Sequence, residues 1–200
     1  IMLTLTQAQA AIRERISLIK SELAQGQSAL RAAYEANDDA PQLLRGRCQL
    51  VDEVLKALWQ DARLPPGLCL VAVGGYGRRE LYPASDIDLL FLLPDNVAQA
   101  TERQLEALIG LLWDIGLDIG HSVRTVWQCL DEAARDITVQ TNLLESRLLY
   151  GSRSLFAEVL KTCRGVLVEN AVGTPGLSEA SSIRSFRLVS VLCMPLRAEG

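Results

Sequence analysis

Two aspartates that follow a run of glycines are the residues of this chain best suited to chemistry. The stretch reads Val73-Gly-Gly-Tyr-Gly-Arg-Arg-Glu-Leu-Tyr-Pro-Ala-Ser-Asp-Ile-Asp-Leu-Leu90. On a strand, Asp86 and Asp88 point to the same side, because successive side chains alternate between faces. Two like charges so placed repel each other unless a cation compensates. Carboxylate oxygens suit Mg²⁺, which completes its shell with water and substrate phosphates. The pair therefore predicts a site for a divalent metal and a phosphate.

The glycines Gly74, Gly75 and Gly77 supply the second half of this site. They follow an apolar run at 68–73, and glycine allows backbone angles and close approaches that a Cβ would block. N–H groups exposed in such a turn can cradle phosphate oxygens. Taken alone, a Gly-Gly pair is a common turn signal and Ser-Asp can cap a loop. Both halves in this order favour a nucleoside triphosphate site.

The residues before this stretch are helical in pattern. Thr4 or Thr6 can cap a helix that runs to about Tyr34, and Pro41 can open a second helix. The sequence Pro65-Pro66-Gly67 then marks a boundary.

Strands and helices alternate after that boundary. We expect a helix from Ala98 to Asp114, capped by Asp95 or Asn96, a helix capped by Thr125, and helical patterns through about 170. The expected strands are 68–73, 87–93 and 117–125. This order predicts an α+β (α/β-type) fold with a small mixed sheet flanked by helices and an N-terminal helical segment.

The predicted organisation has three parts. Residues 1–64 form the helical segment and 65–171 the catalytic core. Residues 172–200 are atypical, with linker-like Gly, Pro and Ser signals, and we expect them to be a flexible tail.

Composition excludes several classes of protein. The net charge of −4 argues against a nucleic-acid-binding surface, which normally has a basic face. No stretch is long and apolar enough for a membrane span, and no signal peptide opens the chain, so we expect a cytoplasmic protein. The five cysteines lack CxxC spacing, which predicts reduced and mostly buried thiols.

The glycine pair, the spacer and the Asp-x-Asp together resemble the DNA polymerase β-like nucleotidyltransferase superfamily. The complete sequence from Gly74 to Leu90 is similar to the corresponding segment of the bacterial PII uridylyltransferase/uridylyl-removing family. Two further blocks, at 112–125 and 136–151, continue the likeness, which spans about 70–156. The resemblance implies a polymerase β-like nucleotidyltransferase core.

The resemblance also implies roles for individual residues. Asp86, Asp88 and Asp118 would be catalytic and would bind the metal, Mg²⁺ or Mn²⁺, and Asp118 would complete the metal site or take the proton from the attacking hydroxyl. The nucleotide-binding residues would be Gly74, Gly75, Gly77, Arg78, Ser85 and Arg124. The arginines could pair with phosphate or neutralise a carboxylate.

Two other positions are informative. Arg79 stands where many relatives are expected to have glycine, which makes the tight turn there less assured. His121, the one histidine of the chain, has no second His or Cys at ligand spacing, so we expect it to hold position rather than bind metal.

The implied reaction moves UMP from UTP to a tyrosine hydroxyl of the nitrogen-regulatory protein PII and releases pyrophosphate. The family's hydrolase domain, which removes the nucleotide, and its ligand-sensing ACT domains are not expected in this chain. Two alternatives remain: adenylyl transfer to another protein or small molecule, and a truncated, inactive domain that binds nucleotide and regulates a partner.

Overall fold

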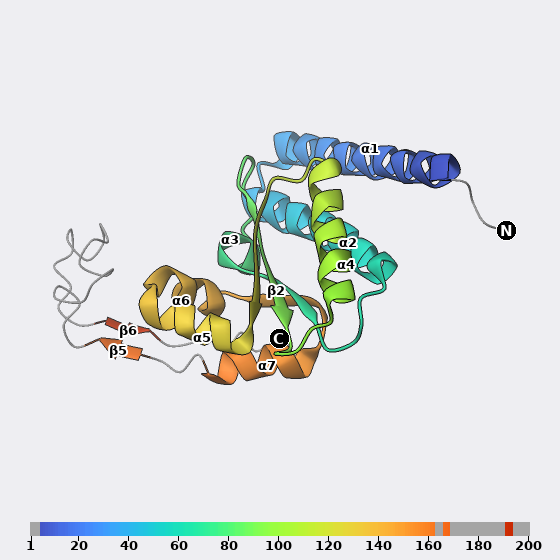
Figure 1. Cartoon of the computed structure of the whole chain (residues 1–200). Coiled ribbons are helices and arrows are strands. Elements are labelled where there is room, and N and C mark those ends of the chain that lie inside the picture. Colours follow the sequence, from blue (N-terminus) through green and yellow to red (C-terminus); the bar gives the residue numbers. More distant parts are fainter. Residues whose placement is uncertain (1–4, 163–165, 169–190, 194–200) are drawn as a thin grey trace. The chain divides into compact units, whose positions relative to one another are not determined.

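The computed structural model describes residues 5–162, 166–168 and 191–193 (Figure 1). The chain divides into two compact units, each made of separate stretches of sequence. The first unit contains residues 1–65, 79–88 and 97–120, and the second contains 66–78, 89–96 and 121–200.

The first unit is helical, as the sequence predicts. Its helices are α1 (Leu5–Asn37), α2 (Ala40–Ala62) and α4 (Gln99–Asp114), and α2 contacts both of the others. Asp38, with a positive φ of 53°, reverses the chain between α1 and α2. Asp39 then caps α2, because its side chain accepts a hydrogen bond from the Gln42 N–H at 2.8 Å. The apolar face of α2 is buried through residues such as Leu55 and Leu58.

The predicted cap of α4 is wrong. The helix begins at Gln99, and its N-cap is Ala98, which has no side-chain oxygen to offer. Asp95 and Asn96 lie too early in the chain, since a capping side chain must directly precede the first turn.

The sheet has four strands in the order β3-β2-β1-β4. The strands are β1 (Cys69–Ala72), β2 (Ile87–Leu93), β3 (Ile119–Thr125) and β4 (Arg147–Gly151). β1 is antiparallel to β2 and to β4, with Ala72 opposite Leu89 on one side and Arg147 on the other. The sheet is mixed, so the remaining pair, β2 with β3, is parallel, as expected for strands joined by a helix. The α+β class predicted from the sequence is confirmed.

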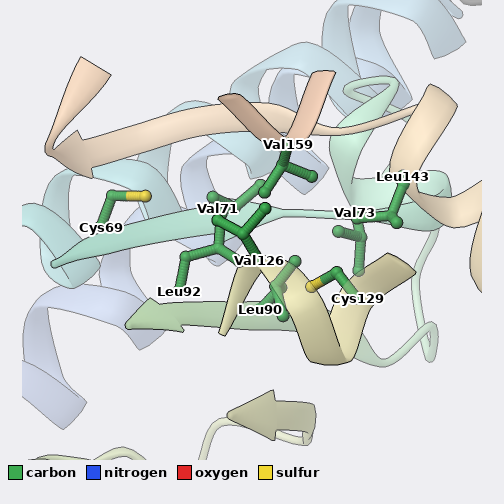
Figure 2. Packing of buried hydrophobic residues seen from close by; sticks show 9 residues of the cluster. All are labelled: Cys69, Val71, Val73, Leu90, Leu92, Val126, Cys129, Leu143 and Val159. Atoms are coloured by element: carbon green, nitrogen blue, oxygen red, sulfur yellow. The ribbon is translucent and has the colours of Figure 1, made fainter. Parts of the chain in front are cut away.

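Helices of the second unit pack on this sheet: α5 (Val126–Arg135), α6 (Ile137–Leu144) and α7 (Arg153–Thr162). The predicted Thr125 cap of α5 is confirmed and is a full capping box, in which Thr125 and Gln128 each bond the other's N–H. Figure 2 shows the core that results, where alternate residues of β1 and β2 meet the helices. Its buried members are Cys69, Val71, Val73, Leu90, Leu92, Val126, Cys129, Leu143 and Val159.

The cysteines of the described part agree with the prediction of buried, reduced thiols: Cys48, Cys69 and Cys129 are buried and belong to no disulfide. Burial, followed by the neighbouring Cys129, raises the pKa of Cys69 to about 12. The thiol therefore stays protonated at neutral pH, and it serves as a small apolar side chain of the core.

The helical pattern predicted from Thr125 through about 170 is wrong at two places, because 147–151 form strand β4 and 166–168 form another strand. Residues Val166–Val168 form strand β5, which pairs with β6 (Val191–Cys193) in a separate antiparallel ribbon. β-Branched valines favour such extended backbone. Apart from β6, the predicted flexible tail lies outside the described residues. None of the helices in the described part is long and apolar enough to cross a membrane.

Candidate active site

The two carboxylates predicted to act together are neighbours in the first unit. Asp86 directly precedes β2 and is exposed, whereas Asp88 is the second residue of the strand and is half-buried. Burial, followed by the negative charge of Asp86, raises the pKa of Asp88 above its ordinary value. Ionisation of both carboxyl groups is therefore unfavourable, and a bound cation would reduce the repulsion between them.

Asp118 lies directly before β3 and its side chain is exposed. Its carbonyl oxygen accepts a hydrogen bond from the Ile87 N–H at 2.8 Å, which aligns the starts of β2 and β3. Among the residues that the structure describes, no three His, Cys, Asp or Glu side chains converge closely enough to hold a metal ion. The structure thus brings Asp86 and Asp88 together without adding Asp118 as a third ligand.

Gly120 in β3 makes room for the carboxylate of Asp88. A Cβ built on Gly120 would lie 2.6 Å from Oδ1 of Asp88, closer than real contacts allow. Sequence reasoning missed this residue. Its only signal was a glycine inside an alternating strand pattern, which often marks a close approach.

In the second unit, Gly74–Gly77 form a one-turn helix, α3, directly after β1. Gly74 has a φ of +57°, which favours glycine. The N–H groups of Gly77 and Arg78 bond back to the carbonyls of Val73 and Gly74. Within the described part of the chain, the N–H groups of Gly74 and Gly75 meet no backbone acceptor. Gly74 is buried and Gly75 is half-buried, and their N–H groups are the donors at the start of this turn.

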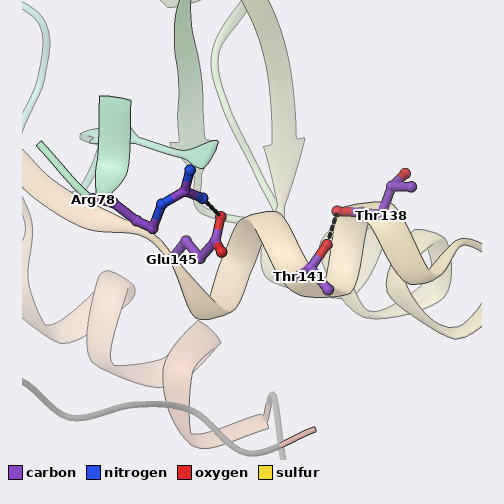
Figure 3. A network of polar contacts seen from close by, with 4 residues as sticks. All are labelled: Arg78, Thr138, Thr141 and Glu145. Atoms are coloured by element: carbon purple, nitrogen blue, oxygen red, sulfur yellow. Dashed lines mark hydrogen bonds and ion pairs between the residues drawn. The ribbon is translucent and has the colours of Figure 1, made fainter. Parts of the chain in front are cut away.

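Arg78 forms an ion pair with Glu145, the C-cap residue that follows α6 (Figure 3). Of the two roles predicted for Arg78, this structure shows the neutralisation of a carboxylate. Gly77 packs at the same place, since a Cβ there would lie 2.0 Å from the backbone oxygen of Glu145. This close contact explains why packing requires a glycine at position 77, separately from the predicted role of Gly77 in nucleotide binding.

Arg147, the first residue of β4, contacts the same C-terminal end of the glycine turn. Its Nη2 and Nε donate to the carbonyl oxygens of Tyr76 and Gly77 at 3.3 and 3.4 Å. Its guanidinium carbon also lies 5.3 Å from the ring centroid of Tyr76, a cation–π distance. Sequence reasoning missed this residue, because nothing local connects it with a turn seventy positions earlier.

The segment between the glycine turn and Asp86 contains unusual backbone. Arg79 and Ala84 have positive φ values of 64° and 65°, a region that costs energy for residues with a Cβ. The predicted nucleotide-binding residue Ser85 is exposed, and its N–H closes a turn to the Tyr82 carbonyl at 3.1 Å. From α2, Nε of Arg47 donates to the carbonyl of the buried Leu81 at 3.1 Å, which anchors the segment.

Arg124 and His121 lie further along β3. Arg124 is half-buried. Hydrogen bonds from Thr138 lower the pKa of Asp136, and the charge of Arg124 contributes to the same shift. Arg124 is therefore close enough to Asp136 to act as its counter-charge. His121 is exposed at the start of the strand.

The donor set of the first unit fits Mg²⁺ or Mn²⁺. Mg²⁺ commonly takes one or two carboxylates and completes its octahedron with water and substrate phosphates. Asp86 and Asp88 provide such a pair, and burial of Asp88, followed by the negative charge of Asp86, raises the pKa of Asp88.

Known proteins resemble this chain over most of its length. No family model matches it. It is 49% identical over 158 residues to the bifunctional uridylyltransferase/uridylyl-removing enzyme of Aromatoleum aromaticum, a match of 79% of this chain and 18% of that protein. Proteins of the same name from Nitrosospira multiformis and Chromobacterium violaceum are also 49% identical, over 74% and 71% of this chain.

The chain spans less than a fifth of the length of these relatives. The match covers most of the chain at nearly half identity. Over the matched stretch, the chain belongs to the family of bifunctional uridylyltransferase/uridylyl-removing enzymes.

Proposed function

We propose that this chain transfers UMP from UTP to a tyrosine hydroxyl of the PII signalling protein and releases pyrophosphate, in the cytoplasm. The observation that supports it most directly is the pairing of Asp86 with the half-buried Asp88, whose pKa is raised by burial and by its neighbour. The likeness to bifunctional uridylyltransferase/uridylyl-removing enzymes supports nucleotidyl transfer in general. UTP and PII as substrates come from the likeness to that family.

Within the second unit, the strand register pairs the last residue of β1 with a residue near the start of β2. Ala72, near the end of β1, lies opposite Leu89, near the start of β2. The chain therefore leaves β1 for the glycine turn at the end of the sheet where β2 begins. The N–H groups of Gly74 and Gly75 would donate to phosphate oxygens of the triphosphate, with Ser85 and Arg124 as further polar contacts to the nucleotide.

Asp86 and Asp88 would hold Mg²⁺ or Mn²⁺. Bound there, the metal supplies charge neutralisation at the phosphoryl group and at the departing oxygen. Asp118 would accept the proton of the tyrosine hydroxyl, for which it must come within hydrogen-bond reach.

The covalent change is an in-line displacement. The tyrosine oxygen forms a bond to the α-phosphorus while the bond from that phosphorus to the bridging oxygen of the β-phosphate breaks, and pyrophosphate leaves. The protein groups contribute position and charge rather than covalent chemistry. The oxygen-rich donor set and the amide donors of the glycine turn suit this task.

The test is incubation of the chain with labelled UTP or ATP, Mg²⁺ and purified PII. Label should reach PII from UTP, and the double variant Asp86→Asn plus Asp88→Asn should abolish the transfer. Asp95→Asn, an exposed aspartate in the loop after β2, is the matched control and should keep full activity. Transfer from ATP alone would replace our proposal with adenylyl transfer. Metal-dependent UTP binding without transfer would favour a nucleotide-binding regulatory domain.

A further inference from the structure

We propose that Arg147 is a positioning residue that fixes the glycine turn in the orientation needed to bind the triphosphate. This inference rests on the proposed function, because it assigns the turn a nucleotide to bind. Arg147 donates to the carbonyl oxygens of Tyr76 and Gly77 and lies over the Tyr76 ring. These contacts involve the last residues of α3, at the end opposite to the N–H groups of Gly74 and Gly75.

The direction of a helical turn explains how Arg147 acts at a distance from the nucleotide. N–H groups point towards the start of the turn and carbonyl groups towards its end. A group that fixes the carbonyls therefore also fixes where the N–H groups point. A cation at the carbonyl end is favourable as well, since partial negative charge gathers there.

Arg147 has a rigid base from which to do this. Arg147 is the first residue of β4, and its backbone lies opposite Ala72 of β1. Ala72 comes two residues before the start of the turn at Gly74. The planar guanidinium offers several donors in a fixed fork, and here two of its nitrogens bond neighbouring carbonyls. The buried Tyr76, 1% exposed, provides a fixed surface beneath it.

The residue two positions earlier reinforces the same arrangement. The backbone oxygen of Glu145 lies against Gly77 so closely that a Cβ would meet it at 2.0 Å. The Glu145 side chain pairs with Arg78 just beyond the turn (Figure 3). Glu145 and Arg147 thus both contact the C-terminal end of the glycine turn, away from the N–H groups of Gly74 and Gly75 at its start.

The first measurement is amide hydrogen exchange at Gly77 and Arg78 in the nucleotide-free protein. Both N–H groups are bonded within the turn, so their exchange reports whether the turn is held. Arg147→Gln should speed this exchange at least tenfold. Arg147→Lys should have an intermediate effect, because an ammonium is a point charge without the fork. Arg135→Gln, which removes an exposed arginine paired with Asp131, is the control and should change nothing.

The second measurement is the affinity for uridine 5′-[α,β-imido]triphosphate with Mg²⁺, compared with that for uridine. Arg147→Gln should weaken triphosphate binding about tenfold, which corresponds to about 1.4 kcal/mol, and leave uridine binding unchanged. A general loss of structure would weaken both ligands together and would overturn the proposal.

The remaining outcomes are also decisive. Unchanged exchange in Arg147→Gln would show that Arg147 does not hold the turn. Faster exchange with unchanged triphosphate affinity would show that the turn's orientation does not matter for binding. Failure of the unaltered protein to bind triphosphate would refute the proposed function itself, and the exchange rates would still decide whether Arg147 fixes the turn.

Discussion

Gly120 leaves the space in which the carboxylate of Asp88 lies: a Cβ on Gly120 would come within 2.6 Å of Oδ1. The clash involves the far end of a side chain, which can rotate away. Gly120→Ala should therefore displace the Asp88 carboxylate rather than unfold the chain. We expect the unfolding free energy to stay the same or rise by up to about 1 kcal/mol, since alanine is more favourable than glycine within a strand.

Activity should fall about 100-fold in Gly120→Ala, the size of effect that a misplacement of about 1 Å produces. Urea unfolding and the UMP-transfer assay, run on the same preparation, check the two halves of the prediction. An active Gly120→Ala variant would mean that Asp88 need not occupy its observed position. A grossly unstable variant would mean that the strand itself cannot accept a methyl group.

Asp88→Asn should make the metal-free protein more stable at neutral pH. The folded state raises the pKa of Asp88 through burial and then through Asp86, so the folded protein binds this proton more tightly than the unfolded chain does. Stability from this group is present below the ordinary aspartate pKa of about 3.9 and is lost as pH rises through the higher folded value. Asparagine carries no charge and removes that loss.

Thermal unfolding from pH 3 to pH 8 measures this effect. Asp88→Asn should unfold at a higher temperature than the native chain at pH 7 and show a smaller decline with rising pH. Asp86→Asn should shift the profile in the same direction by less, because its charge is the second cause of the raised pKa. Identical profiles for Asp88→Asn and the native chain would contradict the assigned environment of this carboxyl group.

Gly77→Ala should destabilise the second unit. The added Cβ would lie 2.0 Å from the Glu145 carbonyl oxygen and 3.1 Å from that of Ala72. Both are backbone atoms that cannot move aside without distorting a strand or a helix end. Overpacking of this kind costs about 1–3 kcal/mol, which urea unfolding can measure.

Gly110→Ala is the matched control for that substitution. Gly110 is exposed in the middle of α4, and a Cβ there meets nothing within 4 Å. Alanine should stabilise this helix by about 1 kcal/mol. If both alanine variants changed stability by the same amount, the close approach at Gly77 would be disproved.

Glycine at position 79 should leave the stability of the fold unchanged or higher, and valine there should lower it. Its φ of 64° lies in the left-handed region, which costs residues with a Cβ about 1–2 kcal/mol and is worst for β-branched side chains. Arg79→Gly should leave the unfolding midpoint equal or higher, and Arg79→Val should lower it. Chemical denaturation of both variants beside the native chain provides the ranking. A midpoint for Arg79→Val equal to the native value would argue for another backbone conformation.

Local signals predicted most of the fold. The bounds of β2 are those expected, 87–93, because the apolar run and its aspartates define a strand without help from other elements. Thr125 and Gln128 have the spacing of a capping box, and the structure contains one. Errors arose where local signals were poor. Ala98 caps α4 without a side-chain oxygen, and the helical pattern predicted after Thr125 is interrupted by two strands, Arg147–Gly151 and Val166–Val168, that form through pairing with distant segments.

The candidate site was predictable in part for the same reason. Asp86 and Asp88 are two residues apart, so their proximity follows from strand geometry. The pairing of Arg78 with Glu145 and the contacts of Arg147 with the glycine turn join residues about seventy positions apart, and no local pattern encodes them. The sequence predicted a glycine turn with N–H donors at Gly74 and Gly75, but not the contacts that hold the turn. The roles of Asp118 and Ser85 stay predictions.

The discontinuous first unit has a consequence for synthesis on the ribosome. Helices α1 and α2 adjoin in sequence and can pair early, but α2 also packs against α4, whose last residue is Asp114. The central strand β1 likewise gains its second neighbour only when β4, ending at Gly151, has emerged. The nascent chain must therefore keep its apolar β1 segment unpaired on one edge from the synthesis of Ala72 until Gly151 has emerged, a period in which a chaperone or rapid elongation would protect it from aggregation.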